Sequence, residues 1–360
     1  MYQEDIMKIK HLNLKDFMAF NHLDMDFSPN INIISGENST GKTALIKLLY
    51  ACVRSNENIQ TSRADFTTDR LEQALVSKLQ GVFRPDHNAV GRLVNRRQGS
   101  NRTKIHVEFN NDDVFDIEFG TRHEKHIDLK CNPNKPNGWS NAVYIPPKEI
   151  ISSTENFVSL YNDYHIAFEE TYYDLARLLE RPLKKGNNTS EQKIVLKRFE
   201  DIVDGNIVQK DRVFYLKVKG SGEFEMGLVS EGYRKLVTIM YLILSGSLSK
   251  NSILFWDEPE TNMNPKMIQP VVDAIIELAK LGVQVFVTTH DYFIQQCFNL
   301  SALYHNSSKN ILQYNFISLY QSDNGIESET ASRLSDLSHN AVMEEFDALY
   351  DREQTLIYGD

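Results

Sequence analysis

Gly36-Glu37-Asn38-Ser39-Thr40-Gly41-Lys42-Thr43 fits the pattern G-x-x-x-x-G-K-[ST], which is typical of a loop that wraps a polyphosphate. The β-branched run at 31–35 predicts a buried strand before the loop, and the apolar run at 44–50 predicts a helix after it. Glycines let the backbone close around phosphates, while the N–H groups and dipole of a helix start favour negative charge. The stretch therefore predicts a strand, a loop and a helix that bind a nucleotide.

Two side chains at the end of this loop predict separate contacts. The Lys42 ammonium would hold the β- and γ-phosphates, and the Thr43 hydroxyl would coordinate Mg²⁺. A glycine-rich turn without a ligand can carry the same letters, but the flanking strand and helix favour the nucleotide site. All eight residues from Gly36 to Thr43 are therefore predicted to bind nucleotide, with ATP and Mg²⁺ as the ligands.

A second set of polar residues follows two predicted strands further along the chain. The apolar run 252–256 delivers Asp257 and Glu258 at its carboxyl end, where ligands contact open parallel sheets. A helix and a second buried strand, 283–287, follow, and that strand runs into His290. The strand, helix, strand order predicts a parallel crossover with both polar ends at one edge of the sheet.

The composition is that of a globular protein. The chain has 360 residues, 41% of them hydrophobic, which predicts one large domain with an insertion or two modest ones. A net charge of -10 does not suit a generally basic nucleic-acid-coating surface but leaves room for a local basic patch. Three widely spaced cysteines, the lack of an N-terminal signal segment and the lack of a run near ~20 apolar residues predict a cytoplasmic protein without membrane contact.

Further elements are predicted from periodicity and turn residues. Residues 7–34 predict a small β-meander, and 54–70 is a polar stretch without a clear pattern. Ser230 is placed as the N-cap of a very apolar helix that ends at 244. The other predicted helices lie at 71–80, 156–180, 191–203, 265–281, 291–298 and 341–350, and the other strands at 105–109, 115–119, 127–129, 142–145, 213–218, 223–226 and 312–319.

These elements predict a single domain over 1–360 with two additions. Residues 53–104 form a predicted inserted lobe and 151–210 a predicted helical lobe. The half from 211 to 360 carries the Ser230 helix, the acid pair and His290.

Three smaller groups of residues allow two interpretations each. A basic cluster can meet phosphates or an acidic partner, or form a solvated charged face, and it comprises Arg92, Arg96, Arg97, Arg102 and Lys104. Two aromatic residues, Phe17 and Phe20, can stack on a nucleobase or pack in the core. His123 and His126 can bind metal, but without matching ligands they are interpreted as surface residues.

Taken together, the loop 36–43, the Ser-x-Gly helix start at Ser230, the acid pair and His290 resemble the ATP-binding-cassette class of ATPases, in its SMC, RecF and OLD branch. The resemblance covers the two ends of the chain. Residues 257–265, DEPETNMNP, look most like the DEPE-x-x-L-H-P element of OLD-type predicted ATPases, many of which serve in bacterial anti-phage systems such as Septu and PARIS. The resemblance implies an α/β fold: an ABC-type P-loop ATPase head with a mixed central sheet, an N-terminal antiparallel β-subdomain and a helical lobe.

The resemblance also implies a role for each site residue. Asp257 would orient the Mg²⁺ shell, and Glu258 would position and deprotonate the attacking water. His290 would contact the γ-phosphate, unless it is only a capping or packing histidine. Ser230 and Gly232 would present a hydroxyl and N–H groups to ATP bound by a second copy, so the active site would need a homodimer.

The sequence departs from the family pattern at three places. Asn264 replaces a usual His or Asp after the acid pair, and Met18 stands where a basic residue is common. No glutamine follows the strand at 142–145, and no long heptad repeat predicts an SMC-type arm. We therefore expect details of water and metal positioning to differ.

Four functions remain open. The favoured hypothesis is a dimeric ATPase that controls a separate effector, such as a nuclease or toxin, in a defence complex. The alternative is a RecF-like repair ATPase that binds duplex DNA in the ATP state. A nuclease with a built-in ATPase is disfavoured because only 70 residues follow His290, without a spaced acidic cluster. A non-catalytic scaffold is disfavoured because Glu258 is present.

Overall fold

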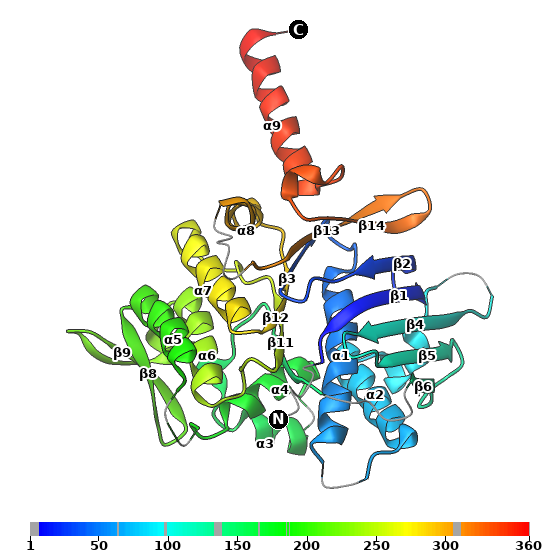
Figure 1. Cartoon of the computed structure of the whole chain (residues 1–360), viewed down its shortest axis with the longest axis horizontal. Coiled ribbons are helices and arrows are strands. Elements are labelled where there is room, and N and C mark those ends of the chain that lie inside the picture. The colour runs from blue at the N-terminus through cyan, green and yellow to red at the C-terminus, as the bar shows by residue number, and fades with distance from the viewer. Residues whose placement is uncertain are drawn as a thin grey trace.

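A six-stranded mixed sheet runs through the middle of the molecule in the order β14-β13-β3-β12-β11-β7 (Figure 1). The computed structural model describes residues 7–359 except 63–64, 97–98, 133–138, 165, 185, 187 and 305–310. The strands are β3 (Ile31–Gly36), β7 (Asn141–Ile145), β11 (Ser252–Asp257), β12 (Gln284–Thr288), β13 (Tyr314–Ser322) and β14 (Gly325–Ala331). All neighbours are parallel except β13 and β14, so the predicted parallel crossover from β11 to β12 is confirmed.

Both faces of this sheet are covered, because successive side chains of a strand point to opposite sides. On β11, Leu254 and Trp256 enter one hydrophobic cluster, while Ile253 and Phe255 enter another. The first cluster includes helices α5 (Ser190–Val203), α6 (Glu231–Leu244), α7 (Ile268–Lys280) and α8 (Tyr292–Tyr304). The second includes α1 (Lys42–Gln60), α2 (Thr68–Phe83) and the antiparallel sheet (Figure 1). The central strands are therefore packed on both faces, and the loops at their ends start from this buried core.

The antiparallel sheet has the order β2-β1-β4-β5-β6. Its strands are β1 (Ile9–Phe17), β2 (Phe20–Asp26), β4 (Arg102–Phe109), β5 (Val114–Gly120) and β6 (Asp128–Asn132). The two strands named for the meander over 7–34 pair as β1 and β2, and the buried strand predicted at 31–35 is β3, which belongs to the six-stranded sheet. Apolar residues at consecutive positions of β3 are buried on both faces, which suits a central parallel strand and not a meander.

The first helix is longer than the sequence pattern predicted. The prediction that the polar stretch 54–70 follows the first helix is wrong for its first part, because α1 continues to Gln60. Arg54 and Glu57 are buried there and form an ion pair of 2.7 Å. A helix that buries charged residues has no apolar period at that point, so the pattern ended before the helix did.

The remaining elements lie around both hydrophobic clusters and at the end of the described chain. Helices α3 (Phe157–Tyr164) and α4 (Glu170–Leu179) precede α5, and a three-stranded sheet of β8 (Gly205–Lys210), β9 (Val213–Val218) and β10 (Gly222–Glu225) follows it. The chain also contains short 3₁₀ helices η1 (Asp86–Asn88), η2 (Val90–Leu93), η3 (Ile151–Ser153), η4 (Met226–Leu228), η5 (Pro265–Met267) and η6 (Leu334–Asp336). The last helix, α9 (Ala341–Tyr358), projects from the body (Figure 1). In the described part of the chain, no helix is both long and apolar enough to cross a membrane.

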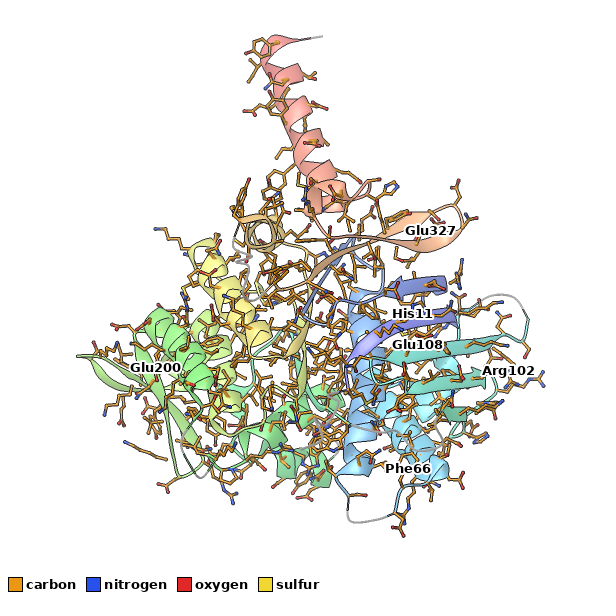
Figure 2. All side chains as sticks on the ribbon, in the orientation of Figure 1. His11, Phe66, Arg102, Glu108, Glu200 and Glu327 are labelled. Carbon is orange, nitrogen blue, oxygen red and sulfur yellow. The ribbon has the colours of Figure 1, made fainter. Side chains whose placement is uncertain are left out.

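The basic cluster carries its own counter-ions. Arg102, at the start of β4, pairs with Glu118 (2.6 Å) and Asp128 (2.7 Å), and Figure 2 shows Arg102 at the outer end of the strands. Arg92 pairs with Asp86 at 2.7 Å, and Arg97 lies outside the described residues. These contacts favour the interpretation as a solvated charged face.

The aromatic and histidine pairs have structural roles. Phe17 and Phe20 are completely buried, so stacking on a nucleobase is wrong for both in this structure. His126 pairs with Glu72 at 2.5 Å, and no group of metal ligands occurs among the described residues. Packing explains Phe17 and Phe20, and the ion pair with Glu72 explains His126.

Candidate functional site

Lys42 lies at the first position of α1 and points back into the loop that precedes it. Its Nζ donates to the carbonyl oxygens of Gly36 (2.9 Å) and Glu37 (2.7 Å). Burial lowers the pKa of Lys42 to about 8, although the carboxylates of Glu258 and Asp257 oppose this shift. The ammonium group is therefore held by neutral carbonyl groups, which phosphate oxygens could replace.

Asp257 ends β11 and is the most connected carboxylate of the site. Its Oδ1 accepts from the Thr43 hydroxyl (3.1 Å) and from Thr288 Oγ1, and its Oδ2 accepts from the Tyr144 hydroxyl (2.9 Å). Burial raises the pKa of Asp257, and the three hydrogen bonds act against that rise. Donors from α1, β7 and β12 thus fix the carboxylate beside Thr43.

Glu258, directly after β11, and His290, shortly after β12, face each other. Glu258 Oε1 lies 3.2 Å from His290 Nε2, and both side chains are about one-third exposed. Glu258 has a left-handed backbone (φ 46°), and its N–H donates to the Thr288 carbonyl across the sheet edge. Burial and the nearby Lys42 lower the pKa of His290. The pair therefore joins a carboxylate to an imidazole that is mainly neutral at neutral pH.

Glu260 is a site residue to which the sequence analysis gave no role. Its Oε1 accepts from Thr289 Oγ1 (2.6 Å) and from the backbone N–H of His290 (3.0 Å). Its Oε2 is buried and has no hydrogen-bond partner among the residues that the structure describes. Burial raises the pKa of Glu260 to about 7. The only sequence signal was its place in the DEPE element.

The Ser230 helix start is connected to the loop after the acid pair. Ser230 is exposed at the N-cap of α6, but its side chain makes no capping hydrogen bond. A Cβ on Gly232 would come within 3.1 Å of Met263. Lys235, one turn further, is buried, and its Nζ donates to the carbonyl of Thr261 at 2.8 Å. Within one copy, Gly232 and Lys235 therefore border the acid loop.

The residues present fit ATP and Mg²⁺. A Cβ at Gly36 (φ 146°) would collide with the Leu319 carbonyl, and one at Gly41 (φ 88°) would collide with the Phe20 ring, so the loop depends on both glycines. The Thr43 hydroxyl and the Asp257 carboxylate are oxygen ligands of the kind that Mg²⁺ prefers. Both predicted ligands already lie side by side.

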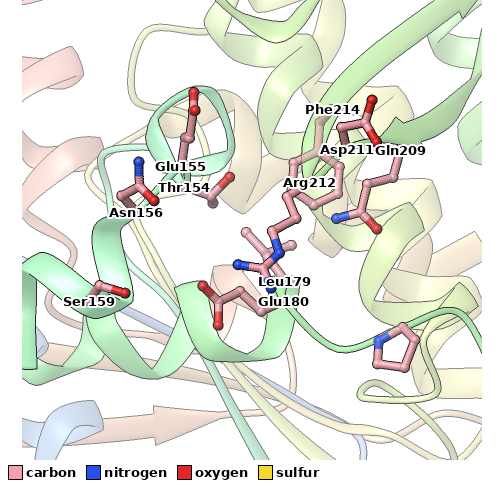
Figure 3. A pocket seen from close by; sticks show the side chains of 11 residues that line it. Thr154, Glu155, Asn156, Ser159, Leu179, Glu180, Gln209, Asp211, Arg212 and Phe214 are labelled. Carbon is pink, nitrogen blue, oxygen red and sulfur yellow. The ribbon is translucent and has the colours of Figure 1, made fainter.

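Cavities occur beside this site and away from it. One of about 350 Å³ is lined by Thr43, Lys47, Tyr144 and Asp257 among others. Another, of about 320 Å³, lies between α3, α4 and the β8–β9 turn, with the Arg212 side chain in its middle (Figure 3). The second cavity contains none of the predicted site residues.

Comparisons with known proteins agree with this geometry. A family model described as "AAA domain, putative AbiEii toxin, Type IV TA system" matches residues 31–294. The DNA replication and repair protein RecF of Halalkalibacterium halodurans is 48% identical over 44 residues, which is 12% of each chain. RecF of Lactococcus lactis is 41% identical over 86 residues, 23% of each chain. Structural maintenance of chromosomes protein 6 of Dictyostelium discoideum is 28% identical over 119 residues, 30% of this chain and 10% of that protein. The chain thus spans less than a quarter of the length of each of these relatives.

Solved structures of SMC heads share the fold. An Smc head bound to the C-winged helix domain of ScpA superposes with a TM-score of 0.55 at 13% identity, covering 91% of this chain and 98% of that chain. The Pyrococcus furiosus Smc head with an extended coiled coil, bound to the C-terminal domain of ScpA, gives 0.53 at 12% identity, covering 96% and 100%. The predicted ABC-type ATPase fold is therefore confirmed.

Proposed function

This chain belongs to the family described as "AAA domain, putative AbiEii toxin, Type IV TA system", and from that premise we propose that it hydrolyses ATP with Mg²⁺. The observation that carries the proposal is the meeting of three strand ends. Thr43 after β3 donates to Asp257 of β11, and Glu258 after β11 contacts His290 after β12. The residues to which we assign phosphate binding, metal binding and the role of the base therefore lie together at one end of the sheet.

The reaction follows from these contacts. Lys42 would exchange the carbonyls of Gly36 and Glu37 for phosphate oxygens, which gain more from an ammonium than a neutral carbonyl does. Mg²⁺ held by Thr43 and Asp257 would neutralise charge on the β- and γ-phosphates. Glu258 would accept a proton from the attacking water.

His290 would act through Glu258 and the γ-phosphate. Its lowered pKa leaves the ring neutral, so it can donate one hydrogen bond without carrying a second positive charge beside Lys42. The Glu260 contact to its backbone N–H would hold the ring at the required place. Glu260 is thus a positioning residue for His290 in this scheme.

The finer proposal is a homodimer that closes around ATP and controls a partner effector. Ser230 is exposed at the helix start, as a residue that contacts a second copy must be. The nucleotide state would then be transmitted to an effector, such as a nuclease or toxin in an anti-phage complex. The similarity of residues 257–265 to the OLD-type element supports this assignment.

A RecF-like DNA-repair function is the second candidate. The matches to RecF, 48% identical over 44 residues and 41% over 86, favour it specifically. Against it stand the net charge of -10 and the paired state of Arg92 and Arg102.

One experiment tests the activity and separates the two candidates. Phosphate release from ATP is measured with Mg²⁺ and with excess EDTA, and binding of fluorescent duplex DNA is measured with and without ATP at two salt concentrations. We expect Mg²⁺-dependent release without ATP-dependent DNA binding. Salt-sensitive DNA binding that requires ATP would favour the repair function, and lack of phosphate release under every condition would contradict the proposed activity.

A further inference from the structure

Helix α9 is anchored at its base and exposed along the rest of its length. Asn340 caps its start and donates to Gln295 of α8 (2.7 Å), while the Phe346 ring lies 4.6 Å from the Tyr292 ring. Figure 1 shows the helix projecting from the body of the molecule, and none of its residues is fully buried. Its direction is therefore set by α8, and its surface is available to another molecule.

The helix carries apolar residues with a seven-residue period, which are half-buried at its base (Val342 and Met343) and exposed from Phe346 onward. Val342, Leu349 and Leu356 are seven apart, and so are Met343, Tyr350 and Ile357, with Phe346 between the two rows. Leu349 is 59% exposed, Leu356 78% and Ile357 60%. A period of seven keeps these residues on one face, as in helices that pair along a seam. These seven apolar residues are called the stripe below. A helix surrounded only by water would not need them.

The base of the stripe borders the nucleotide site. A groove of about 590 Å³ is lined on one side by Val342, Phe346 and Leu349 and on the other by the loop residues 36–38 and by His290. Anything that covers the stripe near its base therefore also covers this groove.

The stripe is nearly self-complementary when a second α9 runs in the opposite direction. If the two antiparallel helices cross at a point between Leu349 and Tyr350 of each, Val342 of one helix lies opposite Ile357 of the other, and Met343 lies opposite Leu356. On one flank of the stripe, Glu345 of each helix comes near Arg352 of the other, so opposite charges meet twice. The one polar position, Glu353, lies opposite Phe346, against which its methylene groups can pack. In a parallel pair Glu353 would instead face Glu353.

We propose that α9 pairs with α9 of a second copy in antiparallel orientation, so that residues 356–358 of each copy reach the groove beside the loop 36–38 and His290 of the other. This interface goes beyond the proposed ATPase function and does not require nucleotide. Two helices of 18 residues bury on the order of 1,000 Å² in total, the low end for specific interfaces. A micromolar dissociation constant is therefore expected.

The first test compares two neighbouring substitutions in the full chain without nucleotide. Leu349→Glu places a charge at the centre of the stripe, and Ala348→Glu places the same charge on the opposite face of the helix. Sedimentation velocity from about 1 to 100 μM should show a monomer–dimer equilibrium for wild type and Ala348→Glu, with at least tenfold weaker association for Leu349→Glu. Equal association of all three proteins, or a monomeric wild type at 100 μM, would overturn the proposal.

The second test fixes the orientation and does not depend on a destabilising variant. Val342→Cys and Ile357→Cys are made separately in a Cys297→Ser background and treated with a short bis-maleimide. Mixed proteins should give a cross-linked dimer, whereas each protein alone should give at least fivefold less. Cross-linking of each variant with itself, without more in the mixture, would show parallel pairing, and no cross-linking in any sample would overturn the interface. ATP hydrolysis is measured on the same samples, so failure of the ATPase proposal shows independently.

Discussion

At the scale of single residues, Glu258 is the side chain on which the proposed chemistry depends most. It contacts His290 and accepts from Thr261 Oγ1 (3.2 Å). In the described part of the chain no hydrogen bond or ion pair joins it to the loop 36–43, on which it acts through its charge near Lys42. Glu258→Gln keeps the shape and removes the base. We expect hydrolysis to fall ~100-fold or more while the ATP dissociation constant changes less than about threefold. Single-turnover and equilibrium binding measurements check both, and hydrolysis within twofold of wild type would place the base elsewhere.

Glu260 gives a pH dependence of stability with a definite sign. The folded pKa of about 7 lies above the ordinary value of 4.5, so the folded chain keeps a proton that the unfolded chain releases. This contribution is fully present below about pH 4.5 and is lost as the pH rises through 7. Relative to Glu260→Gln, which cannot titrate, the wild-type free energy of unfolding should therefore fall by roughly 2 kcal/mol between pH 5 and 8.

Urea unfolding at several pH values measures this difference. Glu180→Gln, at an exposed position, is the control and should follow wild type at every pH. If the free energies of unfolding of wild type and Glu260→Gln change with pH in the same way, Glu260 ionises as an ordinary carboxylate.

At the scale of elements, a buried charge network joins α1 to α2 and α4. Asp174 of α4 accepts from the Tyr50 hydroxyl (2.6 Å) and from Lys78 Nζ (2.7 Å), and Arg54 is 4.0 Å away. Lys47 of α1 adds a hydrogen bond of 2.7 Å to Glu169, just before α4. The helix that follows the phosphate loop is thus tied to its neighbours by charge as well as by packing.

Removal of Asp174 should destabilise the protein strongly. Asp174→Ala leaves Lys78, Arg54 and Tyr50 buried without this acceptor, and such a loss costs about 3–5 kcal/mol. Asp201→Ala breaks the exposed pair with Lys197, which solvent screens, and should leave the unfolding midpoint almost unchanged. Chemical denaturation of both variants makes the comparison, and a similar small loss for both would mean that the network contributes little.

The sequence predicted elements well where local pattern and tertiary packing agree. The loop 36–43 and the run into Asp257 are short, contiguous and flanked by apolar strands, so their structure is encoded locally. Strand β14 escaped prediction because Gly325–Ala331 has few apolar residues and is held at the sheet edge by β13. Strand β8 escaped because only its partner β9 alternates clearly.

In the candidate site, too, only the features that the local sequence encodes could be predicted. Lys42, Thr43, Asp257, Glu258 and His290 could be identified because each follows a recognisable strand or motif. The hydrogen bond from Tyr144 and the backbone contact of Glu260 depend on how distant strand ends meet. Such contacts have no signal in one sequence.

At the scale of the whole molecule, the proposed ATP-bound dimer predicts that two inactive variants restore each other. Ser230→Arg blocks the surface offered to the partner's nucleotide, and Lys42→Ala removes the phosphate contact in its own copy. A heterodimer keeps one site with both residues intact, so mixing should recover activity well above the sum of the parents. The double variant gives the baseline. Activity at the sum of the parents, despite demonstrated subunit exchange, would mean that Ser230 acts in its own copy or that both sites must work together.

The central claim is that the loop 36–43 binds ATP through Lys42, and isothermal titration calorimetry tests it most directly. ATP with Mg²⁺ is titrated into wild type, Lys42→Ala and Lys125→Ala, the last being an exposed lysine away from the loop. We expect saturable binding by wild type and Lys125→Ala, and at least a hundredfold weaker binding by Lys42→Ala, because several charge-assisted phosphate contacts are lost. Equal ATP affinity of Lys42→Ala and wild type would show that Lys42 does not hold the nucleotide.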